Sequence, residues 1–172
     1  MPIACHLVAL TAAALIAGTT PSEALVAEPV VDCDQIILEV ESGRYGGRRV
    51  ALGVVSVPPA YLPEVVLTGS HAWPYASKAG HASKAGLVIR GGSAPVRVSV
   101  HPAWRRRAAT EWGRSGIVSS LRIASCPAYG RDVWNAYSGG FHVRSRTACA
   151  RLIVRVGQRS RTVRFGLGRR CV

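Results

Sequence analysis

The chain has 172 residues, a formal net charge of +13 at pH 7 and a hydrophobic fraction of 48%. This length suits one domain rather than several, and beyond its first residues the chain has no apolar stretch long enough to span a membrane. The charge is the most informative of these numbers, because a strongly basic protein attracts polyanions.

The positive charge is concentrated in the later part of the chain. Residues 1–64 hold three arginines against seven acidic residues, whereas residues 65–172 hold nineteen lysines and arginines against Glu111 and Asp132. Lys78 and Lys84 are the only lysines, so almost every cation is an arginine. A GC-rich genome also encodes much arginine, alanine, valine and glycine. The composition therefore leaves two explanations open, selection for binding and codon bias.

The chain opens with a short apolar segment, residues 7–17, interrupted only by Thr11. As a helix this segment would rise about 16 Å, against about 30 Å for a bilayer core. The small residues Ser22 and Ala24 follow, which favours a signal peptide of residues 1–24 and a secreted β-domain of residues 25–172. No lysine or arginine precedes the apolar segment, which departs from the signal-peptide pattern, and a buried N-terminal helix is the alternative.

Four cysteines remain after the predicted cleavage, namely Cys33, Cys126, Cys149 and Cys171. An even number of cysteines in an oxidising compartment predicts two disulfides. Of the three possible pairings we expect Cys126–Cys149, which closes a local loop, and Cys33–Cys171, which ties the two ends together. Zinc is the alternative, but no Cys-x-x-Cys pair sets up a tetrahedral site. We therefore predict no metal site.

Short apolar stretches between turn signals predict an all-β fold. The predicted strands are residues 35–41, 48–57, 65–67, 87–89, 96–101, 117–124, 134–137, 141–146, 152–156 and 162–165. The first two are expected to form one hairpin, and the last two another around the turn GQRS. No stretch of ten residues has a 3.6-residue period. The sequence thus predicts an antiparallel β-sandwich, Ig-like or jelly-roll-like, with about eight short strands and two disulfides.

A five-residue motif, ASKAG, occurs at residues 76–80 and again at 82–86. One period of six residues is far too short for a solenoid, which needs about three repeats of 20 residues or more. We expect a tandem duplication tolerated in a surface loop, where added length costs little. The alternative is a doubled cationic loop that presents Lys78 and Lys84 to an anionic partner.

The last three predicted strands carry arginines on one side. Residues two apart in a strand share a side, so the apolar residues of these strands face one way and the arginines the other. If the three strands are neighbours, one sheet presents a ladder of guanidinium groups that binds phosphate or carboxylate. The alternative is a solvent-exposed face whose arginines result from GC-rich codon usage and bind no partner. The predicted binding residues are Arg144, Arg146, Arg151, Arg155 and Arg164.

Two further features are candidate binding sites. Residues 105–107, three arginines after Trp104, are expected to be an exposed loop. Aromatic residues, with residues 134–141 (WNAYSGGF) as the most distinctive segment, could build a stacking platform for sugars or bases, but we expect most of them to pack in or over the core. These aromatic residues are Trp73, Trp104, Trp112, Trp134, Tyr45, Tyr61, Tyr75, Tyr129 and Tyr137.

Catalytic motifs are missing from the sequence. There is no G-x-S-x-G nucleophile elbow, no Gly-rich phosphate loop at a strand–helix junction and no metal-binding spacing of histidines. The paired acids Asp32 with Asp34 and Glu39 with Glu41 could supply the two carboxylates of a glycosidase, but such pairs on an exposed strand are usually just solvated. We predict no catalytic residue and no cofactor. The histidines of the predicted mature chain are His71, His81, His101 and His142.

Four stretches, VESGRYGGRRVALGVVSVPPAYLP, GLVIRGGS, WNAYSGGF and VRFGLGRRC, resemble those of small secreted actinobacterial proteins of unassigned function. The resemblance covers most of the predicted mature chain. It implies a secreted, cysteine-bridged domain and brings no catalytic residue with it.

Together these observations predict a secreted, non-catalytic binding or envelope-associated protein. The expected partner is an anionic polymer: cell-envelope polysaccharide, nucleic acid or an acidic lipid surface. The first alternative is a secreted protein-binding module such as a protease inhibitor, which would bind through a loop such as residues 127–133. The second is a hydrolase, which would need a cleft with paired carboxylates or a Ser/His pair.

Overall fold

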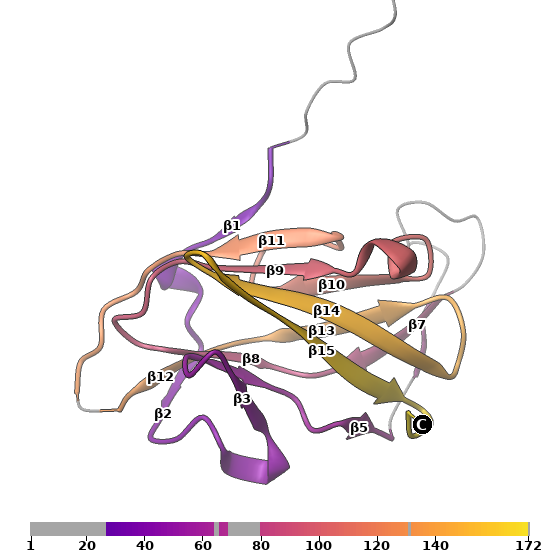
Figure 1. The fold of residues 1–172 in the computed structure, drawn as a ribbon, viewed down its shortest axis with the longest axis horizontal. Helices are drawn as coiled ribbons and strands as arrows, with labels where there is room; N and C mark the ends of the chain where they lie inside the picture. Colours follow the sequence, from indigo (N-terminus) through magenta and orange to yellow (C-terminus); the bar gives the residue numbers. More distant parts are fainter. Residues whose placement is uncertain (1–26, 64–65, 69–79, 131, 172) are drawn as a thin grey trace, which may run out of the picture.

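A computed structural model describes residues 27–63, 66–68, 80–130 and 132–171 (Figure 1). These residues form an all-β protein in which the helical elements are short 3-10 turns, η1 (Cys33–Gln35), η2 (Tyr45–Gly47) and η4 (Pro102–Trp104). The predicted signal peptide lies outside the described residues. No helix in the described part of the chain has the length and apolar character needed to cross a membrane.

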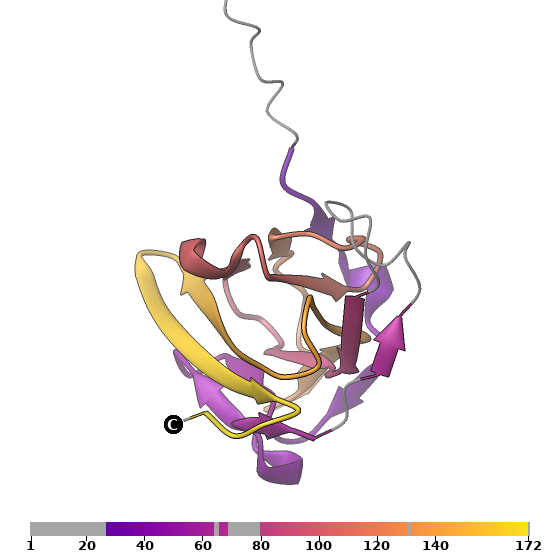
Figure 2. The same ribbon diagram turned by 90° about the vertical axis from the view of Figure 1, so that its right-hand side faces the viewer.

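The strands form three sheets (Figures 1 and 2). The six-stranded sheet contains, in spatial order, β1 (Val30–Val31), β11 (Ser120–Ile123), β9 (Val96–Val100), β14 (Ala148–Val156), β15 (Arg159–Leu167) and β5 (Tyr61–Leu62). The four-stranded sheet contains β10 (Ala108–Trp112), β13 (Gly139–Val143), β7 (Gly80–Lys84) and β6 (Val66–Thr68). The five-stranded sheet contains β2 (Leu38–Val40), β12 (Trp134–Tyr137), β8 (Leu87–Arg90), β4 (Val55–Val57) and β3 (Arg49–Ala51).

The predicted fold class is confirmed: the protein is all-β, with mainly antiparallel sheets in a sandwich-like arrangement and two disulfides. Among the described residues the strands are more numerous than the eight or so expected, and two stretches of chain bend from one sheet into another. β7 continues through Ala85 and Gly86 into β8, and β12 continues through Ser138 into β13. These bends join the four-stranded sheet to the five-stranded sheet.

Gly139 makes the second bend possible. Its φ is +146°, and a Cβ at this position would collide with the carbonyl oxygen of Glu111 and lie 2.7 Å from the Cα of Trp112. An L-residue is therefore excluded both by backbone conformation and by space. The Gly139 carbonyl accepts a hydrogen bond of 2.9 Å from the Ala85 N–H, which ties the two bends to each other.

One apolar core is shared by all three sheets. Valines at alternate positions of β9 and β14 are fully buried, as the period of two requires. From the four-stranded sheet, Phe141 packs edge-on against Trp112 at 5.5 Å between ring centroids and against Phe165 of β15 at 4.9 Å. The Trp112 indole N–H is satisfied by the Ala85 carbonyl at 2.8 Å. Because its polar group is paired, Trp112 contributes its full apolar area to the core.

The expected hairpin between residues 35–41 and 48–57 is wrong. Residues 48–57 form a hairpin by themselves, in which β3 pairs with β4 through a turn at Leu52 and Gly53, whose φ values are +55° and +80°. The Val54 N–H donates to the Ala51 carbonyl at 3.2 Å across these two residues, which closes a tight turn before Ala51 pairs with Val55. β2 pairs with β12 instead.

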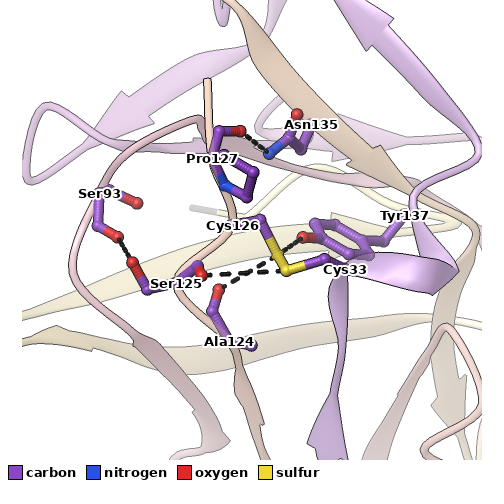
Figure 3. The surroundings of a disulfide bond; sticks show 8 residues. All are labelled: Cys33, Ser93, Ala124, Ser125, Cys126, Pro127, Asn135 and Tyr137. Carbon is purple, nitrogen blue, oxygen red and sulfur yellow. Dashed lines mark hydrogen bonds between the residues drawn. A yellow bond between two sulfur atoms is a disulfide. The ribbon is translucent and has the colours of Figure 1, made fainter. Parts of the chain in front are cut away.

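The predicted number of disulfides is right, but the predicted pairing is wrong. The bonds join Cys33 to Cys126 and Cys149 to Cys171, each with 5.5 Å between the Cα atoms. β1 pairs in parallel with β11, so the turn that follows β1 brings Cys33 beside the segment after β11 (Figure 3). At the other end, the chain turns back after β15 and returns the C-terminal cysteine to the start of β14.

Tyr137 lies against the first disulfide. Its hydroxyl donates to the Sγ of Cys126 at 3.4 Å (Figure 3), and its side chain is almost completely buried. Burial in this apolar environment disfavours the phenolate and raises the pKa of Tyr137 to about 12. The aromatic ring thus acts as a cover over the disulfide and the core.

The second copy of the ASKAG motif lies in a strand rather than in the expected surface loop. β7 pairs with β13 in the register Ser83 to Phe141, and Ser83 and Ala85 are buried. The surface-loop interpretation is wrong for this copy, because its residues pair with β13 and two of its side chains are buried. Residues 76–79 of the first copy, with Lys78, lie outside the described residues.

Candidate anion-binding face

The outer face of the six-stranded sheet carries arginines at the polar positions of its strands. In β9 the valines point inward and are fully buried, whereas Arg97 between them is exposed. The same alternation in β11, β14 and β15 turns leucine, isoleucine, valine and phenylalanine inward and arginine outward. We call the outward set the arginine face; its members are Arg97, Arg122, Arg151, Arg155 and Arg164.

The register of the sheet aligns these arginines in rows. Arg122 pairs with Arg97, and Arg97 pairs with Arg155, so three arginines cross three adjacent strands. Arg151 pairs with Arg164 in a second row. Adjacent strands lie about 4.8 Å apart and each residue rises about 3.3 Å. Arg155 is four positions after Arg151, and the five arginines lie on four adjacent strands, so the face covers roughly 14 by 13 Å.

One carboxylate enters the arginine face. Glu28 accepts a hydrogen bond and ion pair from Arg97 at 2.8 Å, and the Ser120 hydroxyl donates to its other oxygen. Within the part of the chain that the structure describes, no other member of the face forms an ion pair with a carboxylate. The face therefore keeps a net charge of about +4, since a surface ion pair cancels one charge of the five.

The structure brings together three of the five predicted binding residues. Arg151, Arg155 and Arg164 lie on adjacent strands, as expected. Arg144 and Arg146 do not join them, because β13 belongs to the four-stranded sheet and ends at Val143. The expectation that residues 141–146 adjoin the other two strands is thus wrong. Both arginines lie in the connection between β13 and β14.

Arg97 and Arg122 complete the rows but were missed by the sequence reasoning. Each is the polar residue in an alternating strand, VRVSV and SLRI, and that alternation is the signal that could have identified them. Their place beside Arg155 depends on β9 lying between β11 and β14. That strand order joins segments distant in sequence and has no local signature.

The basic segment of residues 105–107 is exposed, as expected, and forms a separate site. Arg105, Arg106 and Arg144 line a pocket of about 390 Å³ with Ser119. The Arg144 N–H donates to the Arg107 carbonyl at 3.1 Å, which holds the two connections side by side.

The aromatic side chains do not build a stacking platform in the described residues. Trp112, Trp134 and Tyr137 are buried, as the sequence reasoning expected for most of them. Tyr61 and Trp104 are half-buried, and Tyr129 has 80% of its surface exposed in the loop after Cys126. Trp73 and Tyr75 lie outside the described residues.

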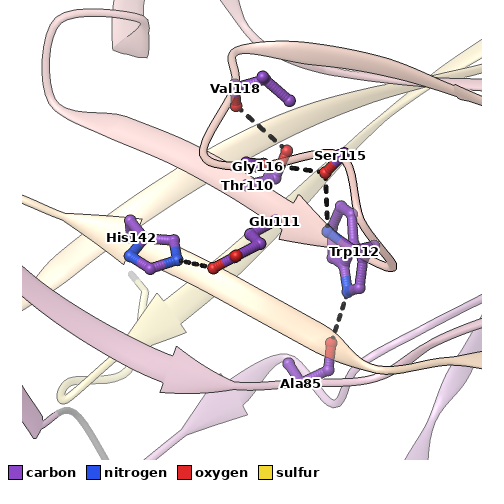
Figure 4. A network of polar contacts seen from close by, with 8 residues as sticks. All are labelled: Ala85, Thr110, Glu111, Trp112, Ser115, Gly116, Val118 and His142. Carbon is purple, nitrogen blue, oxygen red and sulfur yellow. Dashed lines mark hydrogen bonds and ion pairs between the residues drawn. The ribbon is translucent and has the colours of Figure 1, made fainter. Parts of the chain in front are cut away.

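A second polar cluster lies on the outer face of the four-stranded sheet (Figure 4). His142 of β13 and Glu111 of β10 are joined by a contact of 2.9 Å between Nε2 and Oε2. They line a pocket of about 450 Å³ together with Gly139 and Gly140. Ser83, the buried serine of this pocket, shares the inner face of the sheet with Phe141, on the side away from His142. The His142–Glu111 pair therefore links β10 to β13.

Comparisons with protein-family models, with curated proteins and with solved structures found no match for this chain, so the interpretation of these surfaces depends on their own geometry.

Proposed function

We propose that the protein is a secreted, non-catalytic binding protein that holds anionic polymers against its arginine face. The observation that carries this proposal is the register that places Arg122, Arg97 and Arg155 in one row. Like charges directly opposite each other destabilise a sheet. A partner that carries repeated negative charges would relieve that repulsion and bind through several guanidinium groups at once.

The chemistry of the face favours recognition of charge rather than of bases or sugar rings. Between the two arginine rows lie Ser99, Ile153 and Thr162, side chains that offer no stacking surface. Proteins that bind single strands usually combine a basic groove with aromatic platforms. The arginine face has the charge without the platform, so it suits cell-envelope polysaccharide, a nucleic acid backbone or an acidic lipid surface bound by repeated acidic groups.

The disulfides support the proposed location. Two disulfides are typical of proteins in an oxidising compartment, which agrees with the signal peptide of residues 1–24 expected from the sequence and with a destination outside the cell or in the cell envelope. The resemblance to small secreted actinobacterial proteins supports the same location.

Retention of the oxidised protein on immobilised polymers across a salt series tests the proposal. The supports are acidic wall polysaccharide, duplex DNA and anionic liposomes, with a neutral polysaccharide as the control. We expect one polyanion to retain the protein above about 0.15 M salt, where exposed charges are screened beyond about 8 Å. Equal, weak retention on every charged support that disappears by that salt concentration would contradict the proposal and favour a purely compositional charge.

The loop of residues 127–133 supports a second candidate function, a protein-binding module. Tyr129 at its tip is 80% exposed, the disulfide-bonded Cys126 precedes it, and Asp132 is held by Arg90 at 2.6 Å. A loop anchored at both ends with an exposed aromatic residue is a good binding element. A stoichiometric complex with a protease that survives high salt and is lost in Tyr129→Ala would identify this function.

A further inference from the structure

β3 and β15 face each other across a seam that is bridged by arginine side chains. β3 is the last strand of the five-stranded sheet, and β5 pairs with β15 only at Gly166 and Leu167 (Figure 1). Across the seam, the Nη2 atom of Arg49 donates to the Arg164 carbonyl at 2.8 Å, and that of Arg159 donates to the Leu52 carbonyl at 3.4 Å. Two sheets therefore meet here through guanidinium groups, without a backbone ladder between them.

A pocket of about 290 Å³ lies in this seam. Three of its lining residues are arginines, Arg49 from β3 and Arg161 and Arg164 from β15. The rest are small or apolar residues and one threonine, and no acidic residue is among the described residues that line it. The pocket thus has a positive charge with no carboxylate of its own to neutralise it.

Arg49 is held in place before any ligand arrives. Besides its hydrogen bond to Arg164, its guanidinium carbon lies 5.6 Å from the centroid of the buried Phe165 ring, a cation–π distance. The hydrogen bond uses one of the five N–H donors of the guanidinium group. Burial, and second the charge of Arg161, lower the pKa of Arg49. The positive charges are therefore close enough to repel each other, and an anion between them would relieve the repulsion.

The backbone of β15 adds donors to the same pocket. The Gly166 N–H binds the Ala60 carbonyl, and the Arg164 carbonyl accepts from Arg49, so both residues turn their backbone polar groups away from β14. Alternate residues of a strand direct these groups to the same edge. The N–H groups of Thr162 and Arg164 consequently point into the seam, where they add neutral donors to the guanidinium groups.

We propose that the seam pocket between β3 and β15 binds a phosphate monoester group through Arg49 and Arg161. A phosphate monoester carries a charge of about −1.5 to −2 at pH 7 and three acceptor oxygens, which matches two or more guanidinium groups. A single carboxylate carries half that charge and is satisfied by one arginine fork. The pocket volume of about 290 Å³ accommodates such a headgroup together with a small organic group attached to it.

This site is independent of the proposed polymer binding. Arg164 is the only residue shared by the seam pocket and the arginine face, and the row of Arg122, Arg97 and Arg155 lies on the outer surface of the sheet. Substitutions at Arg161 and at Arg122 therefore separate the two sites, so failure of one proposal leaves the other standing.

Calorimetric titration of the oxidised protein at constant ionic strength tests the site, with inorganic phosphate and glycerol phosphate as the monoester probes and dimethyl phosphate as the diester. Arg161 is exposed, so Arg161→Gln keeps the fold and should weaken both dianionic probes about tenfold, the worth of one charge-assisted hydrogen bond. The control Arg44→Gln, which removes the same charge at an exposed position outside both the seam pocket and the arginine face, should change the affinity less than about twofold. Circular dichroism of both variants verifies the fold.

Two further results distinguish a built site from general charge attraction. Affinity for glycerol phosphate should fall as the pH drops below about 6, because the second phosphate proton binds there while arginine stays charged. Dimethyl phosphate, a monoanion at every pH tested, should bind about tenfold more weakly than glycerol phosphate, since each guanidinium hydrogen bond that the diester cannot form is worth about that factor. Equal losses of affinity in Arg161→Gln and Arg44→Gln, or no saturable binding of either monoester to the unsubstituted protein, would overturn the proposal.

Discussion

Arg97 and Arg155 lie directly opposite each other on β9 and β14, and Arg122 continues their row on β11. Such a row repels itself, and among the described residues Glu28 is the carboxylate that ion-pairs with it, through Arg97. Since the row costs stability, a negatively charged partner of the kind proposed above would offset that cost.

Replacing Arg155 by threonine should therefore stabilise the protein. The change removes a like-charge pair directly opposite Arg97, which is worth about 0.2 to 1 kcal/mol in a sheet, and introduces a residue that strands favour. Urea unfolding at low salt should show this gain in the free energy of unfolding. In about 1 M salt, where the screening length is about 3 Å, the gain should shrink. Arg44→Thr, at an exposed arginine outside the sheets, is the control, and a loss of stability in Arg155→Thr would contradict the repulsion argument.

The two disulfides should differ in their contribution to stability. The Cys33–Cys126 bond closes a segment with a sequence separation of 93, and the Cys149–Cys171 bond one of 22. In the chain-entropy treatment these loops correspond to roughly 4.7 and 3.4 kcal/mol at 25 °C. Paired Cys→Ser substitutions measured by urea unfolding should follow this order. Peptide mapping without reduction should recover the Cys33–Cys126 pair, and recovery of Cys126 linked to Cys149 would contradict the fold.

Replacing Gly139 by alanine should disrupt the bend between β12 and β13. The new Cβ would meet the Glu111 carbonyl oxygen and the Trp112 backbone at a residue whose φ is +146°. We expect a loss of more than about 3 kcal/mol, since steric overlap with backbone adds to the strain of an unfavourable conformation. The matched control is Gly157→Ala, at a glycine with φ of +54° and no neighbouring atom within 4 Å. That change should cost only about 1 to 2 kcal/mol, the penalty of the left-handed conformation.

Tyr137 should ionise only in strong alkali and should make the protein sensitive to it. Its pKa is raised from 10.0 to about 12 by burial, so the neutral form is favoured in the folded state. The resulting stability is fully present below pH 10 and is lost as the pH rises from 10 to 12, because the unfolded chain ionises first. The loss should approach roughly 2 to 3 kcal/mol, the worth of about two pKa units.

An absorbance titration of the phenolates at constant temperature, together with urea unfolding at several alkaline pH values, measures this effect. Tyr137→Phe supplies the comparison, because it lacks the buried hydroxyl and should lose less stability over the same pH interval. If both proteins lose stability in parallel, the alkaline transition belongs to other groups.

The parts of the fold set by local alternation could be predicted from the sequence. The valines of β9 show the period of two. A turn signal marks the hairpin of β14 and β15, and a continuous apolar run marks β8. The turn at Leu52 was missed because leucine seldom adopts a positive φ and so gives no turn signal. β7 was missed because its residues, GHASK, are small or polar and resemble those of a loop. The burial of Ser83 comes from its place in the sheet and has no signal in the sequence.

The parts that depend on distant pairing could not be predicted. The disulfide of Cys33 and Cys126 follows from the parallel pairing of β1 with β11, segments about ninety residues apart. The arginine row follows from β9 lying between β11 and β14. Which strands become neighbours is decided by the packing of the whole core, so three of five predicted binding residues were placed together and Arg97 and Arg122 were not recognised.

The most direct test of the account compares two triple variants with equal loss of charge. The first replaces Arg97, Arg122 and Arg155 by glutamine and removes the row. The second replaces Arg44, Arg106 and Arg146, which are exposed and lie outside the six-stranded sheet. Retention on the polyanion that binds the unsubstituted protein best is measured against salt concentration for both.

We expect the row variant to lose most of its retention and its logarithmic salt slope to fall by about 3, roughly one for each phosphate-type contact removed, while the control variant keeps its slope. Equal losses of retention in the two variants would contradict the account, since they would show that total charge, and not the alignment of Arg122, Arg97 and Arg155, holds the polymer.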